Sequence, residues 1–152
     1  MKASEELPPG PAPAFNHGFP ANPYNPHAWI VGEPVIGENC WIGAFTLIDG
    51  QGGLKIGNGV DISSVAQIIT HSTARRCVSQ RRVPMEFCPT TIEDYVFVGT
   101  NAVVLMGCQI GHHSIIAAGA VVVENTTIPP YSLVAGVPAR VIRNIEGEVP
   151  TW

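Results

Sequence analysis

The sequence predicts an all-β protein, a parallel β-helix in which the chain winds into flat coils that stack on one another. An aliphatic residue returns every six positions in two series, which are separated by an irregular segment. An α-helix with 3.6 residues per turn cannot place every sixth residue on one face, whereas extended segments closed by turns can. The first series, which slips by two residues at DGQGG, is Ile30, Ile36, Ile42, Ile48, Ile56, Ile62 and Ile68, and the second is Ile92, Val98, Val104, Ile110, Ile116, Val122, Ile128 and Val134.

Small residues, which follow most of these aliphatic residues four positions later, support the same fold. Six extended residues span about 20 Å. Three such six-residue segments, with turns between them, therefore form a triangular coil of about 18 residues. Fifteen hexapeptides therefore give about five coils. Only small side chains fit the corners of so narrow a prism. Cys40, Ala66 and Cys108 are accordingly expected to be small core residues.

The two ends of the chain differ from the repeat. Seven of the 14 prolines occur by Pro26, so residues 1–28 are expected to form an extended arm and not a paired strand. The β-helix is expected over residues 29–139, with a loop at 72–91 that leaves the coils. Residues 140–152 are expected to cap the last coil, and the segment PARVIRNIEG is expected to form a short C-terminal helix.

Composition excludes several classes of function. A net charge of −4 and a pI near 5.6 argue against a nucleic-acid partner. The sequence has no apolar run of the roughly 18 residues that a membrane span requires, and no signal-like start, so we expect a cytoplasmic protein. The four cysteines lack the spacing of a zinc site.

The segment QIITHSTARRCVSQRRVP interrupts the regular pattern at His71. Four of the eight basic residues lie here, namely Arg75, Arg76, Arg81 and Arg82. A wall of flat coils has no pocket, and a loop that leaves the wall can supply one. Histidine has an unperturbed pKa near 6.5, which makes it a natural general base. We therefore expect His71 to face a cleft.

The hexapeptide pattern, the break at ITHS and the closing run that ends in AGVPARVIR resemble left-handed β-helix acyltransferases. Over residues 29–145 the chain is most similar to the sugar O-acetyltransferases, a group that includes galactoside and maltose acetyltransferases and enzymes that modify surface polysaccharides. The resemblance implies a left-handed β-helix and a homotrimer. It also implies acetyl-CoA as the donor, no metal, and active sites between neighbouring subunits.

The resemblance assigns roles to five residues. His71 matches the catalytic histidine, and the backbone N–H of Thr100 matches the donor to the oxyanion, a contact worth roughly 3 kcal/mol of barrier. Ala118 matches a backbone contact to pantetheine. Arg140 and Arg143 match the positions that hold the CoA phosphates.

Two positions depart from the relatives. Glu124 stands where they commonly have a lysine, so CoA binding is expected to depend more on the two arginines. Gly43 stands where the galactoside enzymes have an acceptor-binding asparagine, which argues against a galactoside.

Four residues are expected to contact the acceptor. Asp49, in DGQGG, looks like an acceptor contact of the polysaccharide-modifying enzymes. Arg81 and Arg82 are expected to contact an anionic acceptor or CoA phosphate, although they also suit a solvated loop surface. Glu86 is expected near the acceptor and is a candidate to orient the His71 ring.

The predicted function is acetyl-CoA-dependent O-acetylation of a carbohydrate hydroxyl by direct transfer, with His71 as the base. N-acetylation of an amino sugar is the main alternative. A zinc carbonic anhydrase of the β-helical type needs three converging histidines, but His71 and His113 are expected on different faces of the coil. A non-catalytic scaffold would need neither the loop at His71 nor a basic C-terminal end.

Residues that point outward predict the assembly. The residue before each inward aliphatic faces outward, and grouping these residues by every third hexapeptide gives three faces. Two adjoining apolar faces and one polar face are what a trimer would require. The first face carries Trp41, Phe97, Ile115 and Leu133, the second Leu47, Val103 and Val121, and the third Gln109 and Thr127.

Overall fold

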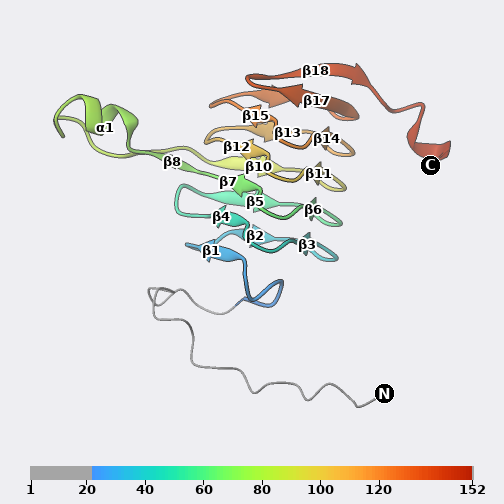
Figure 1. Ribbon diagram of the computed structural model, residues 1–152, viewed down its shortest axis with the longest axis horizontal. Coiled ribbons are helices and arrows are strands. Elements are labelled where there is room, and N and C mark those ends of the chain that lie inside the picture. Colours follow the sequence, from blue (N-terminus) through green and yellow to red (C-terminus); the bar gives the residue numbers. More distant parts are fainter. Residues whose placement is uncertain (1–21, 152) are drawn as a thin grey trace, which may run out of the picture.

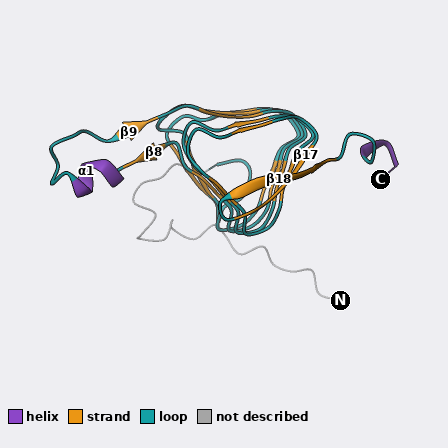
Figure 2. Cartoon of the chain, turned by 90° about the horizontal axis from the view of Figure 1, so that it is seen from above, coloured by secondary structure: helices purple, strands orange, loops and turns teal. Residues whose placement is uncertain are grey.

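A computed structural model describes residues 22–151 and confirms the β-helix. Short parallel strands form the three sides of a prism, and successive coils stack along its axis (Figures 1 and 2). Helix is confined, within the described range, to α1 (Ala74–Val78) and the 3-10 helix η1 (Val149–Thr151). No helix of this range is long and apolar enough to cross a membrane.

Each coil contributes one strand to each of three sheets. The first sheet contains β1 (Trp29–Val31), β4 (Leu47–Asp49), β7 (Gln67–Ile68), β12 (Val103–Val104) and β15 (Val121–Val122). The second contains β2 (Val35–Ile36), β5 (Leu54–Ile56), β10 (Thr90–Ile92), β13 (Gln109–Ile110) and β16 (Thr127–Ile128). The third contains β3 (Trp41–Ile42), β6 (Asp61–Ile62), β11 (Phe97–Val98), β14 (Ile115–Ile116) and β17 (Ser132–Gly136), followed by β18 (Ala139–Asn144). Five parallel strands in each sheet correspond to the five expected coils.

The strand register shows how the loop is inserted. Phe97 pairs with Ile115, which lies 18 positions later and gives the length of a regular coil. Gln67 pairs with Val103, 36 positions later, so the loop adds 36 − 18 = 18 residues to one coil. The loop thus replaces no strand of the β-helix, and the assignment of hexapeptides to the three faces is the same before and after it.

The aliphatic column fills the prism. Ile48, Ile62 and Ile68 have no exposed surface, and full burial of such a side chain is worth about 1.5–3 kcal/mol. Among the small corner residues, Ser132 also closes a turn, because its hydroxyl donates to the Pro129 carbonyl at 2.7 Å. Ala66 and Cys108 are fully buried, as expected, whereas Cys40 is only half-buried.

The loop leaves the prism as an antiparallel ribbon. Strands β8 (His71–Ser72) and β9 (Glu86–Phe87) pair with each other, and α1 lies beyond them, outside the stacked coils (Figure 2). The protrusion therefore begins at His71.

The C-terminal segment differs from the expected helix. Residues 139–144 form β18, which runs antiparallel to β17 and covers the edge of the last coil. Val141 and Ile142 are β-branched and favour a strand, and pairing satisfies the backbone groups that an open edge would leave free. The short helix lies later, at Val149–Thr151. Most of the expected N-terminal arm, residues 1–21, lies outside the described residues.

Candidate active site

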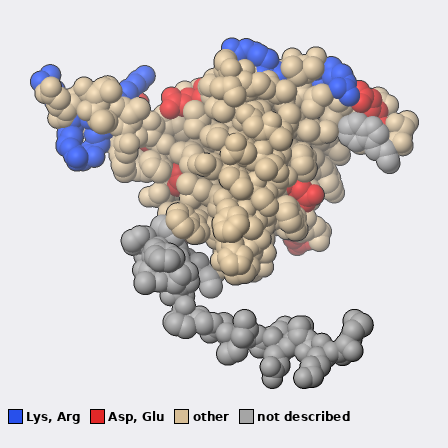
Figure 3. All heavy atoms as spheres, viewed as in Figure 1, with Lys and Arg blue, Asp and Glu red and all other residues tan. Residues whose placement is uncertain are grey.

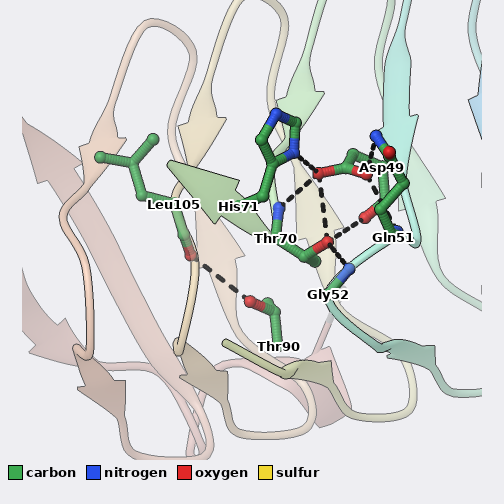
Figure 4. Close-up of polar contacts among 7 residues, drawn as sticks. All are labelled: Asp49, Gln51, Gly52, Thr70, His71, Thr90 and Leu105. Atoms are coloured by element: carbon green, nitrogen blue, oxygen red, sulfur yellow. Dashed lines mark hydrogen bonds and ion pairs between the residues drawn. The ribbon is translucent and has the colours of Figure 1, made fainter. Parts of the chain in front are cut away.

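His71 lies where the first sheet ends and the loop begins. Its ring meets the side chain of Asp49, which ends strand β4 in the coil below, and the distance from His71 Nδ1 to Asp49 Oδ2 is 2.7 Å (Figure 4). The two residues are 22 positions apart, so the stacking of coils is what brings them together.

Asp49 is buried and its carboxylate is fully hydrogen-bonded. Oδ1 accepts from the backbone N–H and side-chain amide of Gln51, at 3.0 and 3.2 Å. Oδ2 accepts from the backbone N–H of Thr70 at 2.8 Å, in addition to its contact with His71. Burial raises the pKa of Asp49, but the hydrogen bonds from Gln51, Thr70 and His71 outweigh it and lower the pKa below its ordinary value. Asp49 is therefore ionised at neutral pH.

The ionised carboxylate fixes the tautomer of His71. A carboxylate only accepts hydrogen bonds, so Nδ1 of His71 carries the proton and Nε2 presents a lone pair. The histidine side chain is 29% exposed, whereas that of Asp49 is 2% exposed. The Phe87 ring lies 6.0 Å from the imidazole, centroid to centroid, on the opposite strand of the ribbon. The pair thus has the arrangement of a general base held by a carboxylate.

Glycines in DGQGG allow the chain to pass close to Thr70. A Cβ on Gly52 would lie 2.0 Å from the Thr70 carbonyl oxygen. The Gly52 N–H donates instead to the Thr70 hydroxyl at 2.8 Å (Figure 4). Gly53 adopts φ +91°, a left-handed conformation that glycine tolerates best. The slip in the sequence repeat therefore builds the support beneath His71.

Two expected acceptor contacts have other partners in the structure. Asp49 is 1% exposed and is occupied by His71, Thr70 and Gln51, so it lies too deep to touch an acceptor. Glu86 forms an ion pair with Arg75 at 3.1 Å. Asp49, not Glu86, orients the histidine ring. The sequence signal for this pairing was the carboxylate at the slip in the repeat.

Arg81 and Arg82 lie in the outer part of the loop and are exposed. Arg81 lines a pocket beside α1, and Arg82 donates to the Gln80 side chain at 3.3 Å.

Thr100 and Ala118 stack at the corner between the third and first sheets. The Gly119 N–H donates to the Thr100 carbonyl at 2.9 Å, and a Cβ on Gly99 would lie 2.5 Å from the Ala118 nitrogen. Thr100 and Ala118 are exposed. His71 follows β7 and Thr100 precedes β12, and because these two strands pair in parallel the two residues lie at opposite ends of the first sheet. One chain therefore does not bring the base and the expected oxyanion donor together.

Arg140 and Arg143 lie on β18 at the end of the last coil, and both are exposed. Arg143 makes a bidentate contact with Glu148, at 2.9 and 2.8 Å, which raises the pKa of the guanidinium. Arg140 donates to the Ala139 carbonyl at 2.8 Å. Glu124 is exposed in the turn after β15.

The two adjacent histidines of the sequence lie in the turn after β13. His112 and His113 approach each other at 3.0 Å between their Nδ1 atoms, and His113 stacks on Tyr131. Over residues 22–151, no three His, Cys, Asp or Glu side chains gather in a way that could hold a metal ion.

Comparison with known proteins supports the resemblance inferred from the sequence. Residues 89–124 match the bacterial transferase hexapeptide (six repeats) family. A 2,3,4,5-tetrahydropyridine-2,6-dicarboxylate N-acetyltransferase of Brevibacillus brevis is 52% identical over 58 residues, which are 38% of this chain and 24% of that protein. The chain thus spans about a quarter of the length of this relative.

Solved structures extend the likeness over most of the fold. A hexapeptide-repeat-containing acetyltransferase of Vibrio cholerae is 28% identical, with a TM-score of 0.63 over 78% of this chain and 71% of the other. That protein has also been solved with acetyl-CoA, with a TM-score of 0.53, 28% identity, and coverage of 79% and 72%. A maltose O-acetyltransferase of Clostridium difficile is 25% identical, with a TM-score of 0.63, and the match covers 77% of this chain and 66% of the other.

Proposed function

We propose that this chain, which resembles hexapeptide-repeat acetyltransferases in sequence and fold, transfers an acetyl group from acetyl-CoA to a carbohydrate hydroxyl. The observation that carries the proposal is the Asp49–His71 pair at the start of the loop. An alcohol is a poor nucleophile until a base removes its proton, and a histidine backed by a carboxylate is suited to that task.

The proposed reaction follows from where the proton lies in the Asp49–His71 pair. Nε2 of His71 accepts the proton of the acceptor hydroxyl while its oxygen attacks the thioester carbonyl carbon. The buried carboxylate of Asp49 stabilises the imidazolium that forms. His71 then returns the proton to the departing CoA sulfur as the carbon–sulfur bond breaks. The atoms balance without a metal or an acyl-enzyme.

The donor site is proposed from the exposed corner and the last coil. The backbone N–H of Thr100 stabilises the oxyanion, and backbone groups near Ala118 hold the pantetheine arm. Arg140 and Arg143 bind the CoA phosphates, and Arg143 exchanges its contact with Glu148 for one with phosphate. The acetyl-CoA complex of the Vibrio acetyltransferase supports this choice of donor.

A homotrimer would complete the proposed site. His71 and Thr100 lie at opposite ends of the first sheet, so the base of one subunit needs the oxyanion donor of a neighbour. The first and third sheets present apolar side chains at the shared corner, as an interface requires: Ile115 and Val121 lie on strands β14 and β15.

N-acetylation is the second candidate, because the Brevibacillus relative is named as an N-acetyltransferase. An amine is more nucleophilic than an alcohol and depends less on a base. The two reactions therefore predict different losses when the base is removed.

Replacing His71 tests the function directly. His71→Ala should lower kcat by on the order of 10² to 10⁴ for a hydroxyl acceptor, with little change in CoA affinity. The measurement is CoA release and product mass against panels of sugars and amino sugars. His113→Ala, at a half-buried histidine in the turn after β13, is the matched control. Activity of His71→Ala within about threefold of the parent would refute the assignment.

A further inference from the structure

The outer part of the loop contains a pocket separate from the Asp49–His71 pair. Its volume is about 470 Å³, within the range of small-molecule sites. The residues that line it are Thr73, Arg76, Cys77, Gln80 and Arg81. The pocket therefore combines two guanidinium groups with a hydroxyl and an amide, all of which can donate hydrogen bonds.

The positive charge of this pocket is uncompensated. Arg75 is held by Glu86, but neither Arg76 nor Arg81 has an ion-pair partner within residues 22–151. Figure 3 shows the basic side chains gathered at the end of the loop, away from the coils. Arg76 is half-buried and lines the pocket beside α1.

The turn that carries Arg81 has an unfavourable backbone. Gln80 and Arg81 adopt φ +56° and +66°, and the Arg82 N–H donates to the Ser79 carbonyl at 3.3 Å. A turn with two left-handed residues favours Asn-Gly, and here it is built from two long side chains instead. Both of these side chains line the pocket.

We propose that this pocket binds a phosphoryl group of a substrate. Guanidinium groups bind phosphate oxygens in a bidentate manner, and paired arginines suit a diphosphate. Thr73 lies two residues after His71, so the pocket begins within about 7 Å of the base along the chain. The proposal rests on the proposed function, because a group bound here belongs to a molecule that reacts at His71. That molecule is either an acceptor sugar linked to a nucleoside diphosphate or CoA itself.

Calorimetric titration of the full chain with inorganic pyrophosphate, uridine diphosphate and CoA tests the pocket. Arg76→Gln with Arg81→Gln should raise the Kd by about tenfold or more per arginine. Loss of pyrophosphate and uridine diphosphate binding with unchanged CoA affinity would assign the pocket to the acceptor. Loss of CoA binding would assign it to the donor. Lys55→Gln, an exposed charge on β5, should leave all three affinities unchanged.

Two results would overturn the proposal. One is that the parent binds none of the three probes, and the other is that the double variant binds them as the parent does. Circular dichroism and thermal unfolding check that the variant folds, and the single variant Arg81→Gln, at an exposed side chain, gives an independent reading. The proposed function is tested by a different measurement. His71→Ala should lower acetyl transfer and leave pyrophosphate binding intact.

Discussion

At the residue scale, Asp49 determines the chemistry that His71 can perform. The carboxylate is buried and accepts hydrogen bonds from three residues, including one from the Nδ1–H of His71. A neutral amide in its place would present an N–H group toward one set of these donors, because an amide has only one acceptor oxygen. Asp49 is therefore a positioning residue, and the direction of the His71 lone pair depends on it.

Asp49→Asn should lower kcat by about 10³ or more while KM for acetyl-CoA changes little, since the wrong tautomer of His71 would be favoured. Rate measurements across a pH series distinguish this from a general loss of structure. Equal kcat for Asn and Asp at position 49 would contradict the role.

The stability of the same variant has a defined pH dependence. The pKa of Asp49 is lowered on folding, so its carboxylate stabilises the fold fully above the ordinary value of 3.8. This contribution disappears as the pH falls below that value, through the folded-state pKa. The difference in free energy of unfolding between parent and Asp49→Asn, measured with urea, should therefore be largest near pH 7 and shrink toward pH 3.

At the element scale, a two-residue slip and an inserted loop turn a regular wall into a site. The slip at DGQGG places Gly52 against Thr70, and the loop leaves immediately afterwards at His71. The chain returns at Thr90, whose hydroxyl lies 3.5 Å from the Leu105 carbonyl (Figure 4). Both irregularities occur at the corner between the first and second sheets, and together they expose the His71 side chain.

Gly52→Ala should destabilise this corner. The new Cβ would lie 2.0 Å from the Thr70 carbonyl oxygen, which belongs to the backbone and has little room to move. We expect a loss of about 2 kcal/mol or more in the free energy of unfolding, together with loss of activity as His71 shifts. Gly147→Ala is the matched control, because a Cβ there meets nothing within 4 Å. Thermal unfolding of the two variants measures the difference, and equal stabilities would exclude the close contact.

At the scale of the whole molecule, the prism has unequal faces. Strand pairing places Trp41, Phe97 and Ile115 in one ladder, with Asp61 as a polar interruption. Such side chains are exposed in the single chain: Trp41 is 55% exposed and Phe97 is 42% exposed. A large apolar surface of this kind favours burial against other copies.

Ile115→Glu with Val121→Glu should dissociate the proposed trimer, because two carboxylates would be buried at the shared corner. Light scattering measures the mass, and acetyl transfer should be lost together with assembly. Gln109→Glu with Thr127→Glu, on the polar second sheet, is the matched control and should remain assembled. A variant that is monomeric and fully active would refute a shared site.

The sequence by itself determined the coil, its length and the face of each residue, because a period of six is a local property of extended chain. It also located the loop and His71, since both interrupt that period. Only the tertiary structure decided that Asp49 holds the histidine and that Glu86 pairs with Arg75, because the first contact crosses between coils and the second joins β9 to α1 within the loop. It likewise decided that residues 139–144 pair with β17 as a strand: the open edge of the last coil supplies hydrogen-bond partners that no local pattern contains.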